Sequence, residues 1–328
     1  MTAGFLVVDK PPGITSHDVV AAVRAVTGIE KVGHTGTLDP FATGVLPLAL
    51  GGATKLIQYL DESIKIYDAT IRLGSATDTG DPTGQVIAEA PLPTADRAGV
   101  DAVLRSFLGD RMQEPPAYSA VKHEGRPLYH YARKGVEVKV DARPIKVHDL
   151  EVVSYTPEEL RILITCSRGT YARVLAHEIA TALGSCGHLS ALERPRSGPF
   201  LLGDALQMAQ LGEIVGGPGG PPWPEVLAPR RKGSPVERVP WRPRAEVLEG
   251  LRPWIRRPLD VLRHLPIAEV GVGQAVRVRQ GALLPPAPPA TPIGGRYLVV
   301  CGADLLGIAE NAPRGPQLLK LLEDGGPA

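Results

Sequence analysis

The sequence is poor in cysteine, which excludes two common kinds of cross-linked or metal-binding framework. Its 328 residues include three cysteines, Cys166, Cys186 and Cys301, and none is a near neighbour of another. The paired CxxC spacing of zinc and redox sites is therefore missing, and the odd count argues against a disulfide framework. We expect free, buried thiols and a reducing compartment.

Long hydrophobic runs are also missing, although apolar residues make up 43% of the chain and can supply a sizeable core. No run approaches the ~18 apolar residues that a membrane-spanning helix needs. The opening stretch MTAGFLVVDK has no basic segment before its short apolar run, so it does not resemble a secretory leader. These features predict a soluble, cytoplasmic protein that makes no membrane contact.

An excess of charge of one sign is absent as well, because 36 Lys and Arg nearly balance 35 Asp and Glu. A nucleic-acid-binding protein can still be near neutral if its charge is segregated. Residues 119–148 carry seven basic residues against three acidic ones, and Tyr118, Tyr129 and Tyr131 lie in or beside this run. Such a pattern suits RNA backbones and bases. A solvated surface over buried tyrosines also explains it, and composition alone favours that simpler interpretation.

Several familiar nucleotide, hydrolase and metal motifs are missing too. GGATK at residues 51–55 lacks the order of a P-loop, and no GxSxG nucleophile turn occurs. DTGDPTG at residues 78–84 fails the spacing of a calcium loop, so we expect a plain turn there. The histidines never pair at metal-ligand spacing. The sequence therefore predicts no metal site.

One loop that is present is rich in glycine and threonine, KVGHTGTLDPFATGVLPLALGGATK at residues 31–55, and contains a single carboxylate, Asp39. Two interpretations stay open from the residues alone. Asp39 precedes Pro40, and this pair is a common turn signal in which the carboxylate caps a backbone amide. The same acid can serve as a nucleophile, with the glycines letting a substrate approach the backbone closely.

The periodicity around this loop predicts a mixed α/β fold. We expect a buried strand over residues 4–10 and a helix over SHDVVAAVRAV, with Ser16 as its N-cap. In KIYDATIRLG, residues 65–74, apolar and polar side chains alternate as in a half-buried strand, and Tyr67 lies on the apolar face.

A second strand and a helix are expected in LRILITCSRGTYARVLAHEIATAL, residues 160–183. The short RGT turn between them places Tyr171 and Arg173 in the first helical turn. Sites often form at such strand-to-helix junctions. From the sequence alone, an ordinary surface arginine is the favoured interpretation of Arg173.

Proline and glycine are concentrated in residues 216–258, which contain ten prolines and six glycines. Such a segment cannot bury enough apolar surface to offset its ordering entropy. Short strands with glycine turns are expected after it, including IAEVGVGQAVRVRQGALL. We therefore expect a catalytic domain over 1–212, a linker or disordered insertion over 213–262, and a small β-rich domain over 263–328.

Six multi-residue segments stand out together: DKPPGITSHD, GHTGTLDPFATGVLPLALGGATK, IYDATIRLGSATDTGDPTG, PPAYSAVKHEGRPLYHYARKG, CSRGTYARVLAHEIA and GHLSALERPRSGPF. In this order they closely resemble the bacterial tRNA pseudouridine-55 synthases, the TruB family. The resemblance runs from about residue 4 to residue 206.

This resemblance implies the pseudouridine synthase fold, with a mixed, largely antiparallel central sheet. It implies an inserted thumb that grips RNA, at about residues 113–148, and a PUA-like RNA-binding domain at the C-terminus. The implied reaction converts uridine 55 in the T-arm loop of tRNA to pseudouridine by base flipping, without metal or cofactor. The T-arm stem-loop is then the partner, with no obligate protein partner.

The resemblance also assigns roles to residues at matching positions. Asp39 matches the nucleophile, which attacks C6 of the base or C1′ of the ribose, a choice that the sequence leaves open. Tyr67 matches the tyrosine that stacks on the flipped base and takes part in proton transfer, and Arg173 the salt-bridge partner of the aspartate. Further residues match positions that contact the base or support the site: His34, Tyr171, Leu192 and Lys10, the last with Pro11.

Two features depart from the family pattern. Glu193 stands where the family usually has a basic residue, and the segment 216–258 is longer and richer in proline than expected. Two other functions stay open. The chain can be a non-catalytic RNA-binding or tRNA-chaperone protein, or a subunit of a guide-RNA-dependent pseudouridine synthase.

Overall fold

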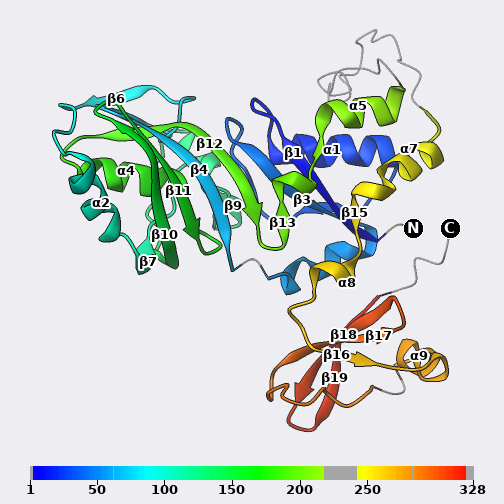
Figure 1. Ribbon diagram of the computed structural model, residues 1–328. Helices are drawn as coiled ribbons and strands as arrows, with labels where there is room; N and C mark the ends of the chain where they lie inside the picture. Colours follow the sequence, from blue (N-terminus) through cyan, green and yellow to red (C-terminus); the bar gives the residue numbers. More distant parts are fainter. Residues whose placement is uncertain (1–2, 62, 137, 218–241, 282–283, 323–328) are drawn as a thin grey trace.

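The computed structural model describes residues 3–61, 63–136, 138–217, 242–281 and 284–322. These residues build one large mixed sheet and a separate four-stranded sheet made of C-terminal strands (Figure 1). Helices flank the large sheet, and the small sheet lies below it in this view. The predicted mixed α/β class is confirmed.

The large sheet is mostly antiparallel. Among its described strand pairs, β1 with β14 and β12 with β3 are parallel, and the others are antiparallel. This confirms the predicted mixed, largely antiparallel sheet. Its spatial order is β14 (Leu206–Gln207), β1 (Gly4–Lys10), β3 (Thr43–Leu50), β12 (Gly187–Ser197), β4 (Lys65–Leu73), β11 (Glu159–Cys166), β10 (Arg143–Thr156) and β7 (Gly109–Gln113); β2 (Val32–His34), β13 (Phe200–Leu201) and β15 (Ile255–Arg256) pair with β3, β12 and β1.

Helix α1 (Ser16–Thr27) is capped by Thr15 rather than by Ser16, which corrects the expected N-cap by one residue. The Thr15 hydroxyl accepts from the Asp18 amide at 3.1 Å, and the Asp18 carboxylate accepts from the Thr15 amide at 2.9 Å. This capping box leaves Ser16 available for another role. Its buried hydroxyl donates to the Leu38 carbonyl and accepts from the Leu38 amide, at 3.1 and 2.9 Å.

Strand β4 confirms the predicted alternation, because every second residue from Tyr67 to Leu73 is buried while the residues between them are half-buried or exposed. Helix α4 (Ala172–Ala182) covers this face, and its Leu175 and Ile179 join the same hydrophobic core. Helix α2 (Arg97–Arg105) adds its own apolar side chains to that core.

Strand β1 is covered on both faces. Leu6 and Val8 belong to the main core, together with apolar residues of α1. Phe5 and Val7 belong to a second core, which also contains Leu298 of the C-terminal sheet. Burial on both faces explains why GFLVV is a continuous apolar run rather than an alternating one.

The small sheet has the order β16 (Ile267–Glu269), β17 (Arg296–Cys301), β18 (Asp304–Ala312) and β19 (Gly315–Leu321). The predicted β-rich character of the C-terminal unit is confirmed. The segment VGQAVRVR, however, forms helix α9 (Val272–Arg279) and not the expected strand. The alternation of valine and arginine suggested a strand, but Ala275 and Val278 are the buried residues, at helical spacing.

The expected linker, residues 213–262, contains regular structure at its start and in its second half. Val247 and Leu251 are buried in the main core. This part of the expected linker therefore helps to cover the large sheet, because two apolar residues at helical spacing outweigh the surrounding prolines. Residues 218–241 lie outside the described residues. The elements here are α5 (Met208–Gly216), α7 (Arg244–Leu251), η3 (Arg252–Trp254), β15 and α8 (Pro258–Val261).

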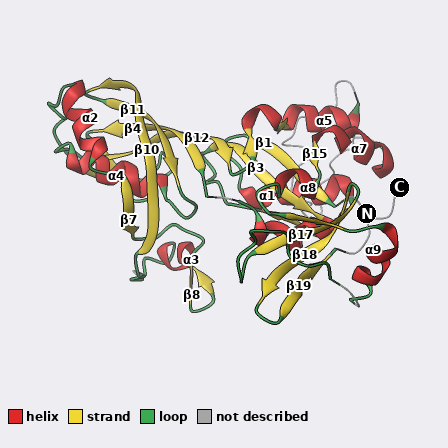
Figure 2. Ribbon diagram, turned by 60° about the horizontal axis from the view of Figure 1, so that its bottom comes forward, coloured by secondary structure: helices red, strands yellow, loops and turns green. Residues whose placement is uncertain are grey.

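Between β7 and β10 the chain leaves the large sheet, at the position for which a thumb is predicted. This segment contains the short hairpin of β8 (Lys122–His123) and β9 (Arg126–Pro127), followed by α3 (Leu128–Ala132). In Figure 2, α3 and β8 lie apart from the strands of the sheet. Leu128 is buried, whereas Tyr129 is 42% exposed.

The cysteines are unpaired, and two of the three are buried as expected. Cys166 and Cys186 are buried, and Cys301 is half-buried. Burial raises the pKa of the Cys166 thiol to about 11. Among the described residues, no helix is both long enough and apolar enough to cross a membrane.

Leu251→Ala tests whether α7 belongs to the core or to a tether. Leu251 is fully buried in the main core, so we expect the free energy of unfolding to fall by about 2–5 kcal/mol. Urea unfolding followed by circular dichroism measures this change. The control is Leu201→Ala on β13, where the side chain is 47% exposed and we expect a change within about 0.5 kcal/mol. Equally small effects in both variants would contradict the packing of α7.

Candidate active site

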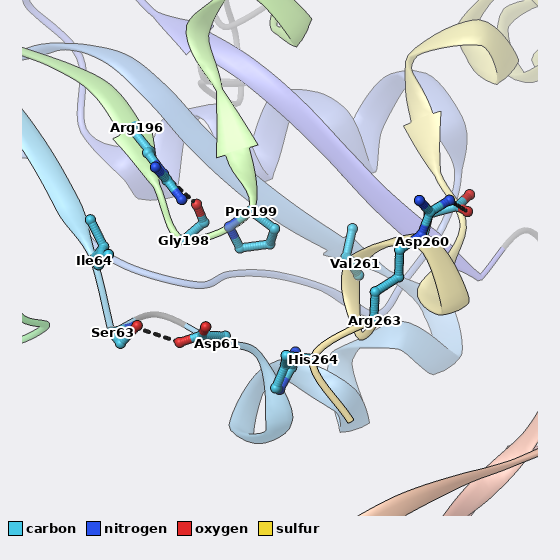
Figure 3. A pocket seen from close by; sticks show the side chains of 10 residues that line it. All are labelled: Asp61, Ser63, Ile64, Arg196, Gly198, Pro199, Asp260, Val261, Arg263 and His264. Carbon is cyan, nitrogen blue, oxygen red and sulfur yellow. Dashed lines mark hydrogen bonds and ion pairs between the residues drawn. The ribbon is translucent and has the colours of Figure 1, made fainter. Parts of the chain in front are cut away.

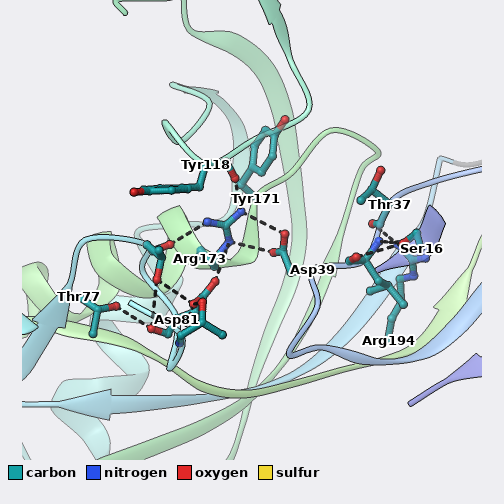
Figure 4. A network of polar contacts seen from close by, with 12 residues as sticks. Ser16, Thr37, Asp39, Thr77, Asp81, Tyr118, Tyr171, Arg173 and Arg194 are labelled. Atoms are coloured by element: carbon teal, nitrogen blue, oxygen red, sulfur yellow. Dashed lines mark hydrogen bonds and ion pairs between the residues drawn. The ribbon is translucent and has the colours of Figure 1, made fainter. Parts of the chain in front are cut away.

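Asp39 and Arg173, which are 134 residues apart in the chain, meet as an ion pair (Figure 4). The guanidinium donates from Nε to Oδ2 at 2.9 Å and from Nη2 to Oδ1 at 3.2 Å. The Arg173 side chain is 5% exposed, and that of Asp39 is 31% exposed. Two N–H donors of the buried guanidinium therefore orient the Asp39 carboxylate, while part of the carboxylate stays accessible to a ligand.

The remaining donors of Arg173 bind two other segments. Nη1 donates to the Thr79 carbonyl and Nη2 to the Tyr118 carbonyl, each at 2.7 Å. Thr79 comes just after strand β5 (Ser75–Thr77), and Tyr118 lies at the start of the insertion between β7 and β10. The guanidinium thus joins the Asp39 loop, the turn after β5 and the first residues of the insertion.

A second carboxylate, Asp81, lies beside Arg173, with Oδ2 at 4.0 Å from Nε. Its Oδ1 accepts from the Thr83 amide and from the hydroxyls of Thr79 and Thr83, at 3.0, 2.8 and 2.5 Å. The segment DTGDPTG is a turn, as expected, but it also supplies groups to Arg173. The sequence alone did not indicate this role, because spacing does not show that the turn folds against the start of α4.

Lys10 binds the backbone of the Asp39 loop and of residues that follow strand β1. Its ammonium donates to the carbonyls of Pro11, Ile14 and Pro40, at 2.9, 2.9 and 3.2 Å, and the residue is fully buried. We expected Lys10 among the residues that bind the substrate or support the site, and the contacts that the structure shows are with backbone carbonyls. Burial lowers the pKa of Lys10 from its ordinary value of 10.5 to about 8, and the Asp39 carboxylate opposes this shift.

Arg194, which the sequence did not single out, fixes the segment that precedes Asp39. It is fully buried and donates to the carbonyls of Val45, Thr37 and Gly36, at 2.9, 3.2 and 3.1 Å. Its backbone approaches Gly44, which has φ +99° and whose added Cβ would lie 2.5 Å from the Arg194 carbonyl oxygen. Only glycine allows β3 and β12 to meet this closely.

Tyr67 and Leu192 lie on the same face of neighbouring strands. Leu192 on β12 stands opposite Ala69 on β4, two residues along from Tyr67, and both side chains are buried. Burial raises the pKa of the Tyr67 phenol, and the Asp39 carboxylate raises it further, while Arg194 opposes both effects. The phenol therefore stays protonated at neutral pH within the electrostatic reach of Asp39.

His34, at the end of β2, is half-buried beside this region. Its ring meets that of His17 edge-on, with centroids 5.5 Å apart. Burial lowers the pKa of His34, and the charges of His17, Arg194 and Lys65 lower it further. Its Nδ1 is buried and finds no hydrogen-bond partner among the described residues. The ring is therefore neutral at neutral pH and can be displaced without breaking an ion pair.

Tyr171 stands directly before α4 as its N-cap residue, so the expectation that it lies in the first turn is wrong by one position. Its side chain is half-buried, and burial raises the pKa of the phenol. Arg173 does lie in the first turn of α4, as predicted. The structure thus joins Asp39 to Arg173 by hydrogen bonds, and it places Lys10 and Tyr67 within the electrostatic reach of the Asp39 carboxylate.

A surface cavity lies away from this constellation (Figure 3), and none of its lining residues belongs to it. Several of its charged groups are already bonded: the Asp260 carboxylate accepts from Arg257 and Arg263, and Arg196 donates to the Gly198 carbonyl. Within the described ranges, no cluster of three or more His, Cys, Asp or Glu side chains could hold a metal ion. The cavity is lined by Asp61, Ser63, Ile64, Arg196, Gly198, Pro199, Asp260, Val261, Arg263 and His264.

The buried ammonium of Lys10 predicts a pH dependence of stability. Its pKa is about 8 in the folded chain and 10.5 when exposed, so between these values the unfolded chain binds more protons and stability rises with pH. Below pH 8 both states are protonated, and Lys10 contributes no slope.

We therefore expect the free energy of unfolding of the wild type, minus that of Lys10→Met, to increase between pH 8 and pH 10. Urea unfolding at several pH values measures it. The exposed Lys31 supplies the control, because Lys31→Met should give a flat difference. A flat difference for Lys10→Met would contradict the depressed pKa.

Known proteins resemble this chain over most of its length. Residues 24–172 match the family model described as TruB family pseudouridylate synthase (N terminal domain). A tRNA pseudouridine synthase B from Aromatoleum aromaticum is 40% identical over 297 residues, covering 90% of this chain and 84% of that protein. One from Geobacter sulfurreducens is 51% identical over 212 residues, covering 65% and 70%. One from Geotalea uraniireducens is 50% identical over 205 residues, covering 62% of this chain and 66% of its own length.

Solved structures share the architecture. A chain in the crystal structure of a Cbf5-Nop10-Gar1 complex superposes with a TM-score of 0.67 at 26% identity, covering 98% of this chain and 85% of that chain. A chain of an archaeal box H/ACA sRNP Nop10-Cbf5 complex has a TM-score of 0.65 at 23% identity, covering 98% and 86%, which supports the fold alone. With these likenesses, and with 40% identity across most of a curated relative, the chain belongs to the TruB family of pseudouridylate synthases.

Proposed function

We propose that this chain is a tRNA pseudouridine synthase that isomerises uridine 55 in the T-arm loop of tRNA. The observation that carries the proposal is the Asp39 carboxylate, held by two hydrogen bonds from the buried Arg173 and yet 31% exposed. The relatives named tRNA pseudouridine synthase B support tRNA as the substrate. Position 55 rests on the resemblance of the sequence motifs to that family.

The reaction breaks the bond between N1 of uracil and C1′ of the ribose and forms a bond between C5 and C1′. C5 loses a proton and N1 gains one, so the atoms and electrons balance without an oxidant or a cofactor. Asp39 is the nucleophile, at C1′ or at C6, and its ester is cleaved before product release. A nucleophilic carboxylate must stay ionised in a site that excludes water, and the Arg173 guanidinium offsets the cost of that desolvation.

The target base is stacked inside a folded loop, so the enzyme must extrude it before any attack. Tyr67 offers an aromatic face and a protonated hydroxyl for stacking and proton transfer, and Leu192 offers an apolar contact on the same face. His34, neutral and without a hydrogen-bond partner at Nδ1 among the described residues, is suited to fill space that the base vacates.

The RNA surface is part of the same proposal. We assign residues 113–148 to a thumb that grips the T-arm, since residues 119–148 carry a local excess of basic residues. The catalytic unit then comprises residues 1–212 together with 242–262, which pack on it, and a PUA-like RNA-binding domain occupies 263–328.

We infer that the chain needs no obligate protein partner and acts in the cytoplasm, where tRNA is found. The relatives that match along most of the chain are named as tRNA-modifying enzymes, whereas the Cbf5 structure is that of a complex with Nop10 and Gar1. Turnover of unmodified tRNA by the purified chain alone tests this point. If activity appeared only with added proteins or a guide RNA, the chain would be a subunit of a larger enzyme.

Asp39→Asn is the primary test of the proposed function. The amide keeps the size of the side chain but is not a nucleophile, so we expect pseudouridine formation to fall by at least about 1,000-fold. Binding of tRNA should change little. Single-turnover assays on unmodified tRNA, with the product mapped to a nucleotide, measure the rate and the position.

The matched control is Asp110→Asn, which alters an exposed carboxylate on β7 and should leave the rate unchanged. Retained turnover by Asp39→Asn would exclude the nucleophile. A wild type that binds tRNA without forming pseudouridine would instead support a chaperone function. Pseudouridine at a position other than 55 would correct the site of action.

Tyr67→Phe separates stacking from proton transfer. The ring remains while the hydroxyl is lost, so tRNA should still bind, and we expect the single-turnover rate to fall by about 100- to 10,000-fold. Tyr155→Phe is the control, because that hydroxyl binds the Ala95 carbonyl outside the site. A near-normal rate for Tyr67→Phe would limit Tyr67 to packing.

A further inference from the structure

Gln113, the last residue of β7, uses both ends of its amide on the backbone of one distant residue. Its Oε1 accepts from the Tyr171 amide at 2.8 Å, and its Nε2 donates to the Tyr171 carbonyl at 3.2 Å. Gln113 is only 3% exposed, so water does not compete for these bonds. Neither the sequence motifs nor the proposed reaction gives this residue a role.

Tyr171, whose backbone Gln113 binds, is the N-cap residue of α4. Tyr171 makes no capping hydrogen bond with its own side chain, and its carbonyl also accepts from the Leu175 amide at 3.1 Å, the first bond of the helix. Arg173 lies two residues further along. Gln113 therefore sets the position of the turn from which the guanidinium reaches Asp39.

Gln113 also stands at the root of the insertion. Its strand partner is Arg143 at the start of β10, so residues 114–142 leave and re-enter the sheet at this rung. Five residues beyond Gln113, the Tyr118 carbonyl accepts from Arg173 at 2.7 Å (Figure 4). The contacts form a closed circuit from Gln113 through Tyr171 and Arg173 to Tyr118, and back along the chain.

We propose that Gln113 is a positioning residue that couples the root of the thumb to the Asp39–Arg173 ion pair. The inference rests on the proposed function, in which Arg173 orients the nucleophile. A displacement of the thumb root moves either the Tyr171 backbone or the Tyr118 carbonyl, and both set the guanidinium. A neutral amide suits this place, because the backbone of one residue offers one donor and one acceptor, and a side chain with the complementary pair satisfies both.

Gln113→Leu and Gln113→Glu test the coupling. Gln113→Leu removes both bonds, and we expect the single-turnover rate at saturating enzyme to fall by about 10- to 100-fold, because small misplacements of reacting groups are costly. The Kd for tRNA should stay close to that of the wild type. Gln113→Glu keeps the acceptor, but its ionised carboxylate has no donor for the Tyr171 carbonyl.

The pH profile of Gln113→Glu supplies a readout that loss of fold alone would not produce. Lowering the pH protonates the introduced carboxyl group, which then offers both a donor and an acceptor. We expect the rate of Gln113→Glu relative to the wild type to rise as the pH falls from 8 to 5.5. Val152→Ala is the control: it removes buried volume from β10 without touching Tyr171, and should lower stability but not the rate.

Hydrogen exchange separates this inference from the proposed function. The Tyr171 amide and the first turn of α4 should exchange faster in Gln113→Leu than in the wild type, whether or not the chain forms pseudouridine. Unchanged exchange, or a rate loss no larger than that of Val152→Ala, would overturn the coupling. If the wild type formed no pseudouridine but Gln113→Leu still exchanged faster at Tyr171, the proposed function would be excluded. The structural coupling through Gln113 would then stand.

Discussion

The ion pair between Asp39 and Arg173 is the interaction on which the rest of the site depends. A carboxylate and a guanidinium that are largely removed from water repay their desolvation only when their geometry is good and their other hydrogen bonds are satisfied. Here the arginine has two bonds to the carboxylate and one each to two carbonyls. Segments that are distant in the chain are thereby held in one arrangement, which none of them could adopt alone.

Buried cations organise the loop around that pair. Lys10 and Arg194 are fully buried, and each binds three backbone carbonyls in or near the Asp39 loop. A glycine- and threonine-rich loop has few apolar side chains with which to pack, so hydrogen bonds to its backbone must define its shape. The result is a fixed set of dipoles and charges around the carboxylate, which needs little reorganisation when a substrate arrives.

The sequence predicted much of the fold and part of the site. The alternation in β4 and the apolar face of α4 follow directly from the periodicity of the residues. The motif resemblance pointed to Asp39, Tyr67 and Arg173, and the structure joins the first and last of these as an ion pair. The sequence did not predict helix α7, because the composition of this stretch was judged together with the prolines around it. It did not predict helix α9, because the valines of this stretch alternate with arginines as in a strand.

Contacts between segments that are distant in the chain were the least predictable part. Asp81, Arg194 and Gln113 act on backbone groups or on a charge far away in sequence, and no local pattern signals such partners. The three carbonyls that the buried ammonium of Lys10 binds are likewise not signalled by any local pattern. The chemistry of a side chain is known from the sequence. The backbone groups to which a buried polar side chain forms hydrogen bonds depend on the assembled fold.

Strand β1 is a single element that serves two cores. Phe5 and Val7 lie in the second core, which contains Phe200 as well as Leu298 of the C-terminal sheet, and Leu6 and Val8 lie in the main core, so no side of the strand is free to meet water. Removal of the C-terminal strands would expose apolar residues of the second core to water, and the truncated protein would be prone to aggregate. The C-terminal sheet is thus part of the packing that stabilises the large sheet. A change of side-chain volume in the second core therefore affects the packing of both sheets.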